Sequence, residues 1–247
     1  MDMSFWVGTI GASQAQRKLD VVSNNLANAN NNGFKAKNAV FAELVNYNLN
    51  AGRDEVTDLQ AGAGAIVSAT NTDFRSAALT QTNRMLDYAI MADNQFFQVR
   101  DQATGAITLT RDGHFHAGEM QDGRFVLMTD SDKFVLNTQG ELTYLDVTNG
   151  ADEGRLAEGQ QIGIFTVPFP SRLQNVGDDD FRVREGDNNN PITLVELPSV
   201  VTGALEQSGT DIAKEFTNLI EAQRAFSYNL RMVQTSDEVA QTINGLR

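Results

Sequence analysis

The residues of this chain best suited to bind a metal ion are two histidines separated by a single position. His114 and His116 belong to the segment HFH. In a β-strand, alternate side chains point to the same side, so both imidazoles would face one way. Zinc takes three or four protein ligands, and no third ligand is evident nearby in the sequence. We therefore interpret the pair as part of an exposed strand face and predict no metal site.

Clustered carboxylates are the other chemistry that the sequence offers. Asp178, Asp179 and Asp180 form the run GDDDF, but the spaced oxygen ligands of a calcium-binding EF-hand loop are missing, so a solvated turn is the better interpretation. The sequence has no nucleophile elbow, phosphate-binding loop or zinc-protease motif. The motifs of the sequence predict no catalytic residue, no cofactor and no enzymatic activity.

Composition and charge narrow the possible partners. The chain has 247 residues, 41% of them hydrophobic, and a formal net charge of −13. Such a charge repels phosphate backbones and anionic lipid surfaces, which excludes nucleic acid as an expected partner. No apolar run approaches the roughly 20 residues of a membrane helix, so we expect no membrane insertion. Cysteine is absent, and the N-terminus lacks the residue order of a cleaved secretory signal.

The two ends of the chain have the period of long amphipathic helices. In the N-terminal segment, apolar and small residues recur at alternating spacings of three and four. They are Phe5, Gly8, Ala12, Ala15, Leu19, Val22 and Leu26. The C-terminal segment repeats the pattern with Ile212, Phe216, Leu219, Gln223, Phe226, Leu230 and Val233. Candidate N-cap side chains at Ser208, Thr210 and Asp211 predict that this second helix begins near residue 210.

The residues between the helices have the period of β-structure. Short segments rich in Ile, Val, Phe, Thr and Tyr alternate with Gly, Asp and Asn turns. We therefore predict a mixed α and β protein, in which the terminal helices pair as a discontinuous, coiled-coil-like domain around a central all-β domain. The predicted domains are residues 1–33 with 205–247 for the helices, 34–85 for an extended connector arm with one or two strands, and 86–204 for the β domain.

A run of asparagines marks the end of the first helix. Asn24 and Asn25 still belong to the helical pattern, whereas Asn28 and the asparagines that follow it favour helix termination, because their side chains compete for backbone hydrogen bonds. Gly33 then permits a sharp change of direction, and Phe34 would anchor the chain after the turn. We interpret this stretch as a hinge between helix and arm.

The terminal helices cannot bury enough apolar surface on their own. The N-terminal stripe has few large apolar residues, each worth roughly 1.5–3 kcal/mol when buried, whereas ordering each backbone residue costs about 1–2 kcal/mol. Pairing the helices still leaves the outer flanks in water, and exposed apolar surface usually marks an interaction site. We predict an assembly interface made of Phe5, Leu19, Val22, Leu26, Ile212, Phe216, Leu219, Phe226, Leu230 and Val233.

Three motifs resemble a known family. The segment SNNLANANNNGFK at 23–35 is similar to the N-terminal signature of bacterial flagellar rod and hook proteins. The segments at 79–101 and 110–126 resemble the entry to the family's β domain, and 203–242 resembles its C-terminal helix. In the first motif, the matching signature and hinge residues are Asn24, Asn25, Leu26, Ala27, Asn28, Gly33, Phe34 and Lys35. The length resembles that of a rod protein more than that of the longer hook protein.

The resemblance implies a function and a location. It implies a structural subunit of the flagellar basal-body rod, which polymerises through its terminal helices into a hollow shaft that transmits torque to the hook. The implied partners are copies of the chain, other rod and hook proteins and the flagellar export apparatus. The implied location is the basal body in the periplasm or cell wall zone, reached without a cleaved signal peptide.

Two questions stay open at this point. At the matching family positions, Asp87 and Arg111 would form hydrogen bonds that fix hairpins, but both could equally be ordinary surface charges. The second question is the function itself, because the β domain could be a freestanding module that binds glycan or peptidoglycan, with the helices only closing it.

Overall fold

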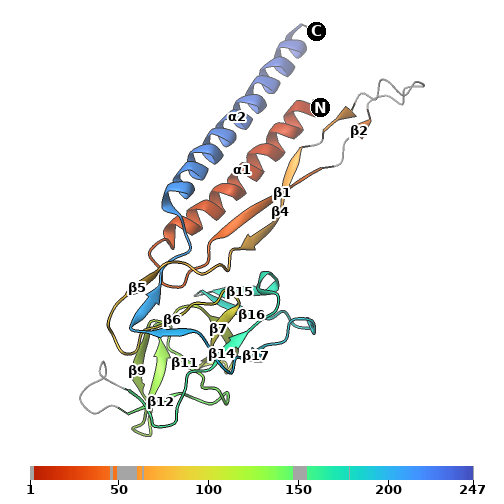
Figure 1. Ribbon diagram of the computed structural model, residues 1–247. Helices are drawn as coiled ribbons and strands as arrows, with labels where there is room; N and C mark the ends of the chain where they lie inside the picture. The colour runs from red at the N-terminus through yellow and green to blue at the C-terminus, as the bar shows by residue number, and fades with distance from the viewer. Residues whose placement is uncertain are drawn as a thin grey trace. The chain divides into compact units, whose positions relative to one another are not determined.

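The computed structural model describes residues 3–44, 47–48, 60–62, 64–146, 155–177 and 179–246. The protein is a mixed α and β structure with one helix near each end of the chain. It divides into two compact units (Figure 1). Unit 1 comprises Met1–Ala27, Lys37–Asn71 and Asp211–Arg247, and unit 2 comprises Asn28–Ala36 and Thr72–Thr210.

Unit 1 contains the two long helices, α1 (Met3–Ala27) and α2 (Ile212–Gly245). They lie side by side and run in opposite directions (Figure 1), with the hydroxyls of Ser4 and Ser236 3.1 Å apart. Small residues permit this approach, because a Cβ atom at Gly11 would lie only 2.7 Å from the side chain of Asn229. Asp211 caps α2 by accepting a hydrogen bond from the amide of Lys214. The helix therefore begins where the sequence predicts.

The arm contains more strands than the sequence predicted. The prediction of one or two strands between 34 and 85 was wrong, because the described part of this range forms β1 (Lys37–Glu43), β2 (Tyr47–Asn48), β3 (Gln60–Ala61), β4 (Ala65–Thr72) and β5 (Leu79–Gln81). β1 pairs with β4, and β2 pairs with β3. Strand β4 has no fully buried residue, so the hydrophobic alternation that identifies a strand is missing.

Unit 2 is built around a large antiparallel sheet. Its main path runs β13-β12-β10-β11-β7-β8-β16-β15, while β9, β14 and β17 pair beside this path. Two smaller pairs join β18 to β6 and β19 to β5. The remaining strands of the unit are β6 (Tyr88–Ile90), β7 (Gln95–Asp101), β8 (Ile107–Thr110), β9 (Phe115–Glu119), β10 (Phe125–Thr129), β11 (Lys133–Val135), β12 (Tyr144–Asp146), β13 (Arg155–Leu156), β14 (Ile164–Thr166), β15 (Gln174–Gly177), β16 (Asp180–Arg182), β17 (Thr193–Leu194), β18 (Val200–Thr202) and β19 (Ala204–Glu206).

Two apolar clusters hold unit 2 together. The larger one includes Leu86, Phe97 and Phe115, and the rings of the two phenylalanines meet edge to face with centroids 5.1 Å apart. The smaller one gathers around Phe96 and Phe181. Phe96 and Phe97 enter different clusters because successive side chains of β7 point to opposite faces of the sheet. The core therefore fills both faces of the central strands.

Candidate assembly site

The end of α1 is fixed by one asparagine side chain. Asn25 is 1% exposed; its amide nitrogen donates to the carbonyl of Lys37 at 2.7 Å, and its oxygen accepts from the amide of Lys37 at 2.9 Å. The side-chain amide of Asn25 thus makes the same pair of hydrogen bonds to the backbone of Lys37 that a residue of a neighbouring β-strand would make. The helix ends at Ala27, as the sequence predicts, and the side chain of Asn31 bonds that of Asn28 in the following turn.

The turn after the helix brings two distant parts of unit 2 together. Gly33 has φ +67°, and its amide donates to the carbonyl of Glu206 at 2.8 Å. Phe34 is 3% exposed, and its carbonyl accepts from the amide of Gly209 at 2.8 Å. The hydroxyl of Ser208 donates to the carbonyl of Asn28. The segments that enter and leave unit 2 are thus hydrogen-bonded to each other.

A buried ionic cluster lies directly behind this turn. Lys35 Nζ donates to Oε1 of Glu206 at 2.7 Å, and Arg111 Nε donates to Oε2 of the same carboxylate at 2.9 Å. All three side chains are at most 1% exposed. We call Lys35, Arg111 and Glu206 the ionic cluster. It joins residues from the start, middle and end of unit 2, so the unit is complete only when all three segments are in place.

Backbone carbonyls accept further hydrogen bonds from the ionic cluster. Lys35 Nζ also donates to the carbonyl of Arg75, while Arg111 donates to the carbonyls of Ala92, Gln95 and Ile90. These bonds offset part of the free-energy cost of burying charge. Burial lowers the pKa of the Lys35 amine, and the charge of Arg111 lowers this pKa further, whereas Glu206 opposes the shift.

The structure answers the question about Asp87 and Arg111. Asp87 is 1% exposed, accepts a 2.6 Å hydrogen bond from the hydroxyl of Thr82 and pairs with Arg84 at 3.5 Å. Arg111 belongs to the ionic cluster. Neither side chain is a surface charge, so the prediction that Asp87 and Arg111 form structural hydrogen bonds is confirmed. Glu206 was missed by sequence reasoning, although a charged residue beside Leu205 in a β-rich stretch was an available signal.

The predicted interface residues divide into a buried or partly buried group and a smaller exposed group. Val22 is buried between the elements of unit 1, and Leu19, Leu26, Leu219, Phe226 and Val233 are partly buried. The more exposed members are Phe5 (37%), Ile212 (45%), Phe216 (48%) and Leu230 (41%). The residues of α2 that are buried are Glu215 and Ala222. Large apolar side chains of α2 are therefore still available to another molecule.

The two histidines share one carboxylate. His114 Nδ1 lies 2.9 Å from Asp130, and His116 Nδ1 lies 3.7 Å from it, while Nε2 of His114 contacts the guanidinium of Arg84. Within the described ranges, no group of three or more His, Cys, Asp or Glu side chains is arranged to hold a metal ion. Asp178, the first member of the predicted acidic turn, lies outside the described residues.

The described helices give no candidate for a membrane span, since none combines the required length with sufficient apolar character.

Comparison with known proteins agrees with the resemblance seen in the motifs. Residues 7–35 match the family "Flagella basal body rod protein", and residues 201–246 match "Flagellar basal body rod FlgEFG protein C-terminal". The matched ranges contain the turn of Gly33 and the strand of Glu206. Both halves of the candidate site therefore lie in segments that these families describe.

Relatives resemble the chain over almost its whole length. The flagellar basal-body rod protein FlgG of Bacillus subtilis is 29% identical, with 99% of this chain and 98% of the relative covered. FlgG of Buchnera aphidicola subsp. Baizongia pistaciae is 28% identical, with 98% of each covered. The flagellar hook-basal body complex protein FlhP of B. subtilis is 27% identical, with 95% and 96% covered. The likeness thus includes the β unit as well as the helices.

Proposed function

Because the chain belongs to the family of flagellar basal-body rod proteins, we propose that it is a structural subunit of the basal-body rod, the hollow shaft that transmits torque to the hook. The observation that carries this conclusion is the likeness to FlgG over 99% of the chain. The family is a structural one, and we assign no catalysis to this member. No observation favours the alternative of a glycan-binding or peptidoglycan-binding module.

The terminal helices would form the assembly domain. We propose that residues 1–33 and 205–247 pair as a discontinuous, coiled-coil-like domain, with 34–85 as its arm and 86–204 as a separate β domain. The antiparallel contact of α1 with α2 supports this pairing, as does the 3.7 Å ion pair between Lys18 and Glu221. Small residues at the contact leave the large side chains facing outward.

The exposed apolar residues would supply the contacts between subunits. Ile212, Phe216 and Leu230 are each more than 40% exposed, and burial of such side chains is the main driving force of association. Contacts between non-identical patches build open helical assemblies, which is the symmetry that a shaft requires. The partners would be copies of this chain and other basal-body proteins.

The turn at 28–35 would act as the hinge of the subunit. Gly33 changes the direction of the chain, and the ionic cluster with Phe34 fixes its course immediately afterwards. We further propose that the flagellar export apparatus delivers the chain to the basal body in the periplasm or cell wall zone. Assembly of unit 2 from three distant segments is compatible with folding after export.

A deletion strain tests this function. Complementation with an epitope-tagged full-length chain should restore swimming, and the tag should be found in purified basal bodies. A tagged F216K/L230K double variant should be exported but not incorporated, since two lysines would be placed in the proposed contacts. Normal swimming of the deletion strain, or absence of the wild-type tag from basal bodies, would overturn the proposal.

A further inference from the structure

The turn after α1 contains the dipeptide Asn32–Gly33. In an Asn–Gly pair, the backbone nitrogen of the glycine can attack the side-chain carbonyl carbon of the asparagine, since no side chain on the glycine blocks the approach. The fold needs this glycine, because Gly33 has φ +67° and a Cβ atom there would lie 2.6 Å from the carbonyl carbon of Arg111. The geometry of the turn therefore retains a reactive pair in the chain.

The reaction of such a pair is a deamidation that consumes only water. The nitrogen of Gly33 forms a bond to Cγ of Asn32 and loses its proton, while the bond from Cγ to the side-chain nitrogen breaks and ammonia leaves. Water then opens the resulting five-membered imide at one of its two carbonyls. The product is aspartate or isoaspartate. In isoaspartate the main chain runs through Cβ and is longer by one carbon atom.

The folded unit 2 holds the attacking nitrogen in place. The N–H of Gly33 donates to the carbonyl of Glu206 at 2.8 Å. The carbonyl of the next residue, Phe34, accepts from the amide of Gly209 at 2.8 Å, and both Gly33 and Phe34 are buried. Closure of the imide requires the peptide group between Asn32 and Gly33 to rotate, which breaks the bond to Glu206. The reaction therefore needs a local opening of unit 2.

The isoaspartate product does not fit the closed turn. The added main-chain atom would lie between two bonded points, because the carbonyl of Asn28 accepts from the hydroxyl of Ser208 at 2.9 Å and Gly33 is bonded to Glu206. Beyond the turn, Lys35 Nζ lies 2.7 Å from Oε1 of Glu206 in the ionic cluster, where both side chains are at most 1% exposed. A close-packed interior has no room for the added atom. The closed turn and this modification therefore exclude each other.

We propose that Asn32 is a deamidation site of the unfolded chain, and that closure of unit 2 around Gly33 prevents the reaction. Chains that stay unfolded acquire isoaspartate in the turn and then cannot close unit 2. The modification is thus an irreversible mark of slow folding. This inference concerns the folding of unit 2 and holds whether or not the chain polymerises into a rod.

A second Asn–Gly pair in the described ranges is held much less firmly. Asn244 and Gly245 are the last two residues of α2 in unit 1. Asn244 is exposed, and no atom lies within 4 Å of a Cβ position at Gly245. Because helix ends fray, the backbone of this pair can rotate without the opening of a core. The pair at Asn244 is therefore an internal reference with the same chemistry.

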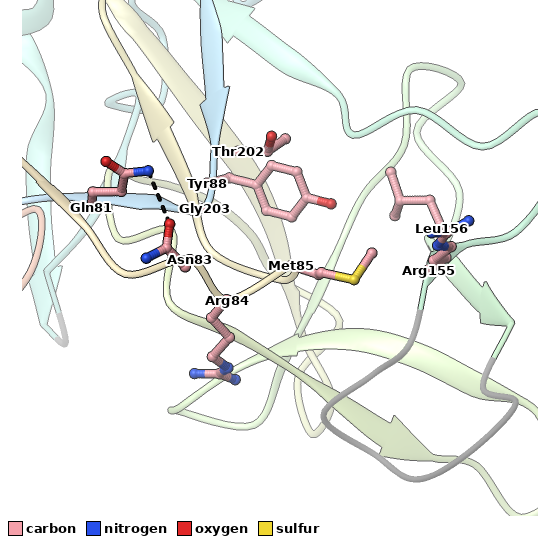
Figure 2. A pocket seen from close by; sticks show the side chains of 9 residues that line it. All are labelled: Gln81, Asn83, Arg84, Met85, Tyr88, Arg155, Leu156, Thr202 and Gly203. Carbon is pink, nitrogen blue, oxygen red and sulfur yellow. Dashed lines mark hydrogen bonds between the residues drawn. The ribbon is translucent and has the colours of Figure 1, made fainter.

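Asn83 is an internal control for the residue that follows the asparagine. It also lies in a turn, with φ +59°, but the next residue is Arg84, whose side chain blocks the approach to the backbone nitrogen. Figure 2 shows Asn83 at a cavity of unit 2, where its Oδ1 accepts from Nε2 of Gln81 at 2.9 Å. We expect Asn83 to react much more slowly than Asn32 when the chain is unfolded.

Mass spectrometry of tryptic peptides from the full-length chain tests the proposal. Samples are kept at mildly alkaline pH in buffer or in concentrated guanidinium chloride, and a zero-time digest corrects for deamidation during digestion. Peptides 19–35, 76–84 and 232–247 report on Asn32, Asn83 and Asn244. Asn32 should react at least about 100-fold more slowly in buffer than in denaturant, whereas Asn244 should change by less than about tenfold, because a protected site reacts only through its opened fraction.

A variant that opens unit 2 separates protection by the fold from protection by the local sequence. E206Q leaves Lys35 and Arg111 without a counter-charge, so it should raise the rate at Asn32 in buffer by about tenfold or more, with E185Q as the matched control. If E206Q does not fold, wild type in rising concentrations of guanidinium chloride replaces it. The rate at Asn32 should then follow the unfolded fraction measured by circular dichroism.

Three results would overturn the inference. The first is a rate at Asn32 that denaturant raises no more than the rate at Asn244. The second is an equal rate at Asn83 and Asn32 in denaturant, which would show that the glycine is not the cause. The third concerns refolding, because chains with isoaspartate at position 32 should stay sensitive to protease after the denaturant is removed, while unmodified chains regain resistance. Equal recovery of both would show that the turn tolerates the modification.

Discussion

Glu206 connects three parts of the chain through a single carboxylate. Its oxygens accept from Lys35, from Arg111 and from the amide of Ala77, the last at 2.8 Å. Its carbonyl also accepts from Gly33. With two cations and one anion, the ionic cluster depends on this side chain, because it supplies the only negative charge of the three.

Replacing Glu206 with glutamine should destabilise unit 2 strongly. E206Q preserves the shape of the side chain but leaves Lys35 and Arg111 without a counter-charge in a buried place. Removing one partner of a buried ion pair costs about 3–5 kcal/mol. The free energy of unfolding from urea titration checks this, with E185Q as the matched control because Glu185 is exposed in the same unit. A loss no greater than that of the control would contradict the account of the cluster.

Asp112 makes stability depend on pH near neutrality. The pKa of this carboxyl group is raised from 3.8 to about 6, chiefly by burial and in smaller part by the charge of Asp130, although the hydrogen bond from the amide of His114 opposes the shift. Because the pKa of Asp112 is higher in the folded chain than in the unfolded chain, this carboxyl group contributes its full stability at a pH below its unfolded pKa. That contribution is lost as the pH rises through about 6. D112N should therefore stabilise the protein above pH 6 by up to about 3 kcal/mol. Thermal unfolding of both chains between pH 4 and 8 checks this, and an equal difference at every pH would count against it.

The local sequence shows a charge at Glu206 beside Leu205 in a β-rich stretch, but it does not identify the partners of that charge. Lys35 and Glu206 are separated by 171 positions, and lysine and glutamate are ordinarily surface residues. From the sequence, Arg111 could equally form structural hydrogen bonds or be an ordinary surface charge, because its partners lie far away along the chain. A buried charge becomes recognisable only when the fold places its counter-charge beside it, so this part of the site could not be predicted from composition or period.

At the scale of elements, the turn after α1 depends on a glycine for two reasons. Gly33 has φ +67°, and a Cβ atom there would lie 2.6 Å from the carbonyl carbon of Arg111. G33A should lower the free energy of unfolding by more than the roughly 1–2 kcal/mol of the backbone conformation alone. G123A isolates that conformational cost, because Gly123 has φ +78° and no atom within 4 Å of its Cβ position. Equal losses in the two variants would show that the close approach at Gly33 is unimportant.

The helices could be predicted from the sequence and the arm could not. The end of α1 at Ala27 follows from the asparagines, and the start of α2 follows from the capping side chain of Asp211. Strands β1 and β4 pair with each other and carry no fully buried residue. A sheet with so little buried surface shows no apolar alternation, which is the signal that strand prediction needs.

At the scale of the whole molecule, the outer faces of the helices should matter for association and not for folding. Phe216 and Leu230 are 48% and 41% exposed in the single chain, so their replacement removes little buried surface from it. In an assembly, each would lose its remaining exposure to water. We therefore expect F216S and L230S to fold normally and to associate more weakly, by about 1 kcal/mol or fivefold for each lost contact.

Two measurements on the same samples separate these effects. Urea titration of the dilute chain should give free energies of unfolding within about 0.5 kcal/mol of wild type, as expected for exposed positions, while sedimentation at high concentration should show the loss of assembly. Q234S is the matched control, because Gln234 is an exposed polar residue of the same helix. If F216S destabilises the dilute chain and leaves sedimentation unchanged, Phe216 packs within its own molecule, and the apolar face of α2 is not the surface that joins subunits.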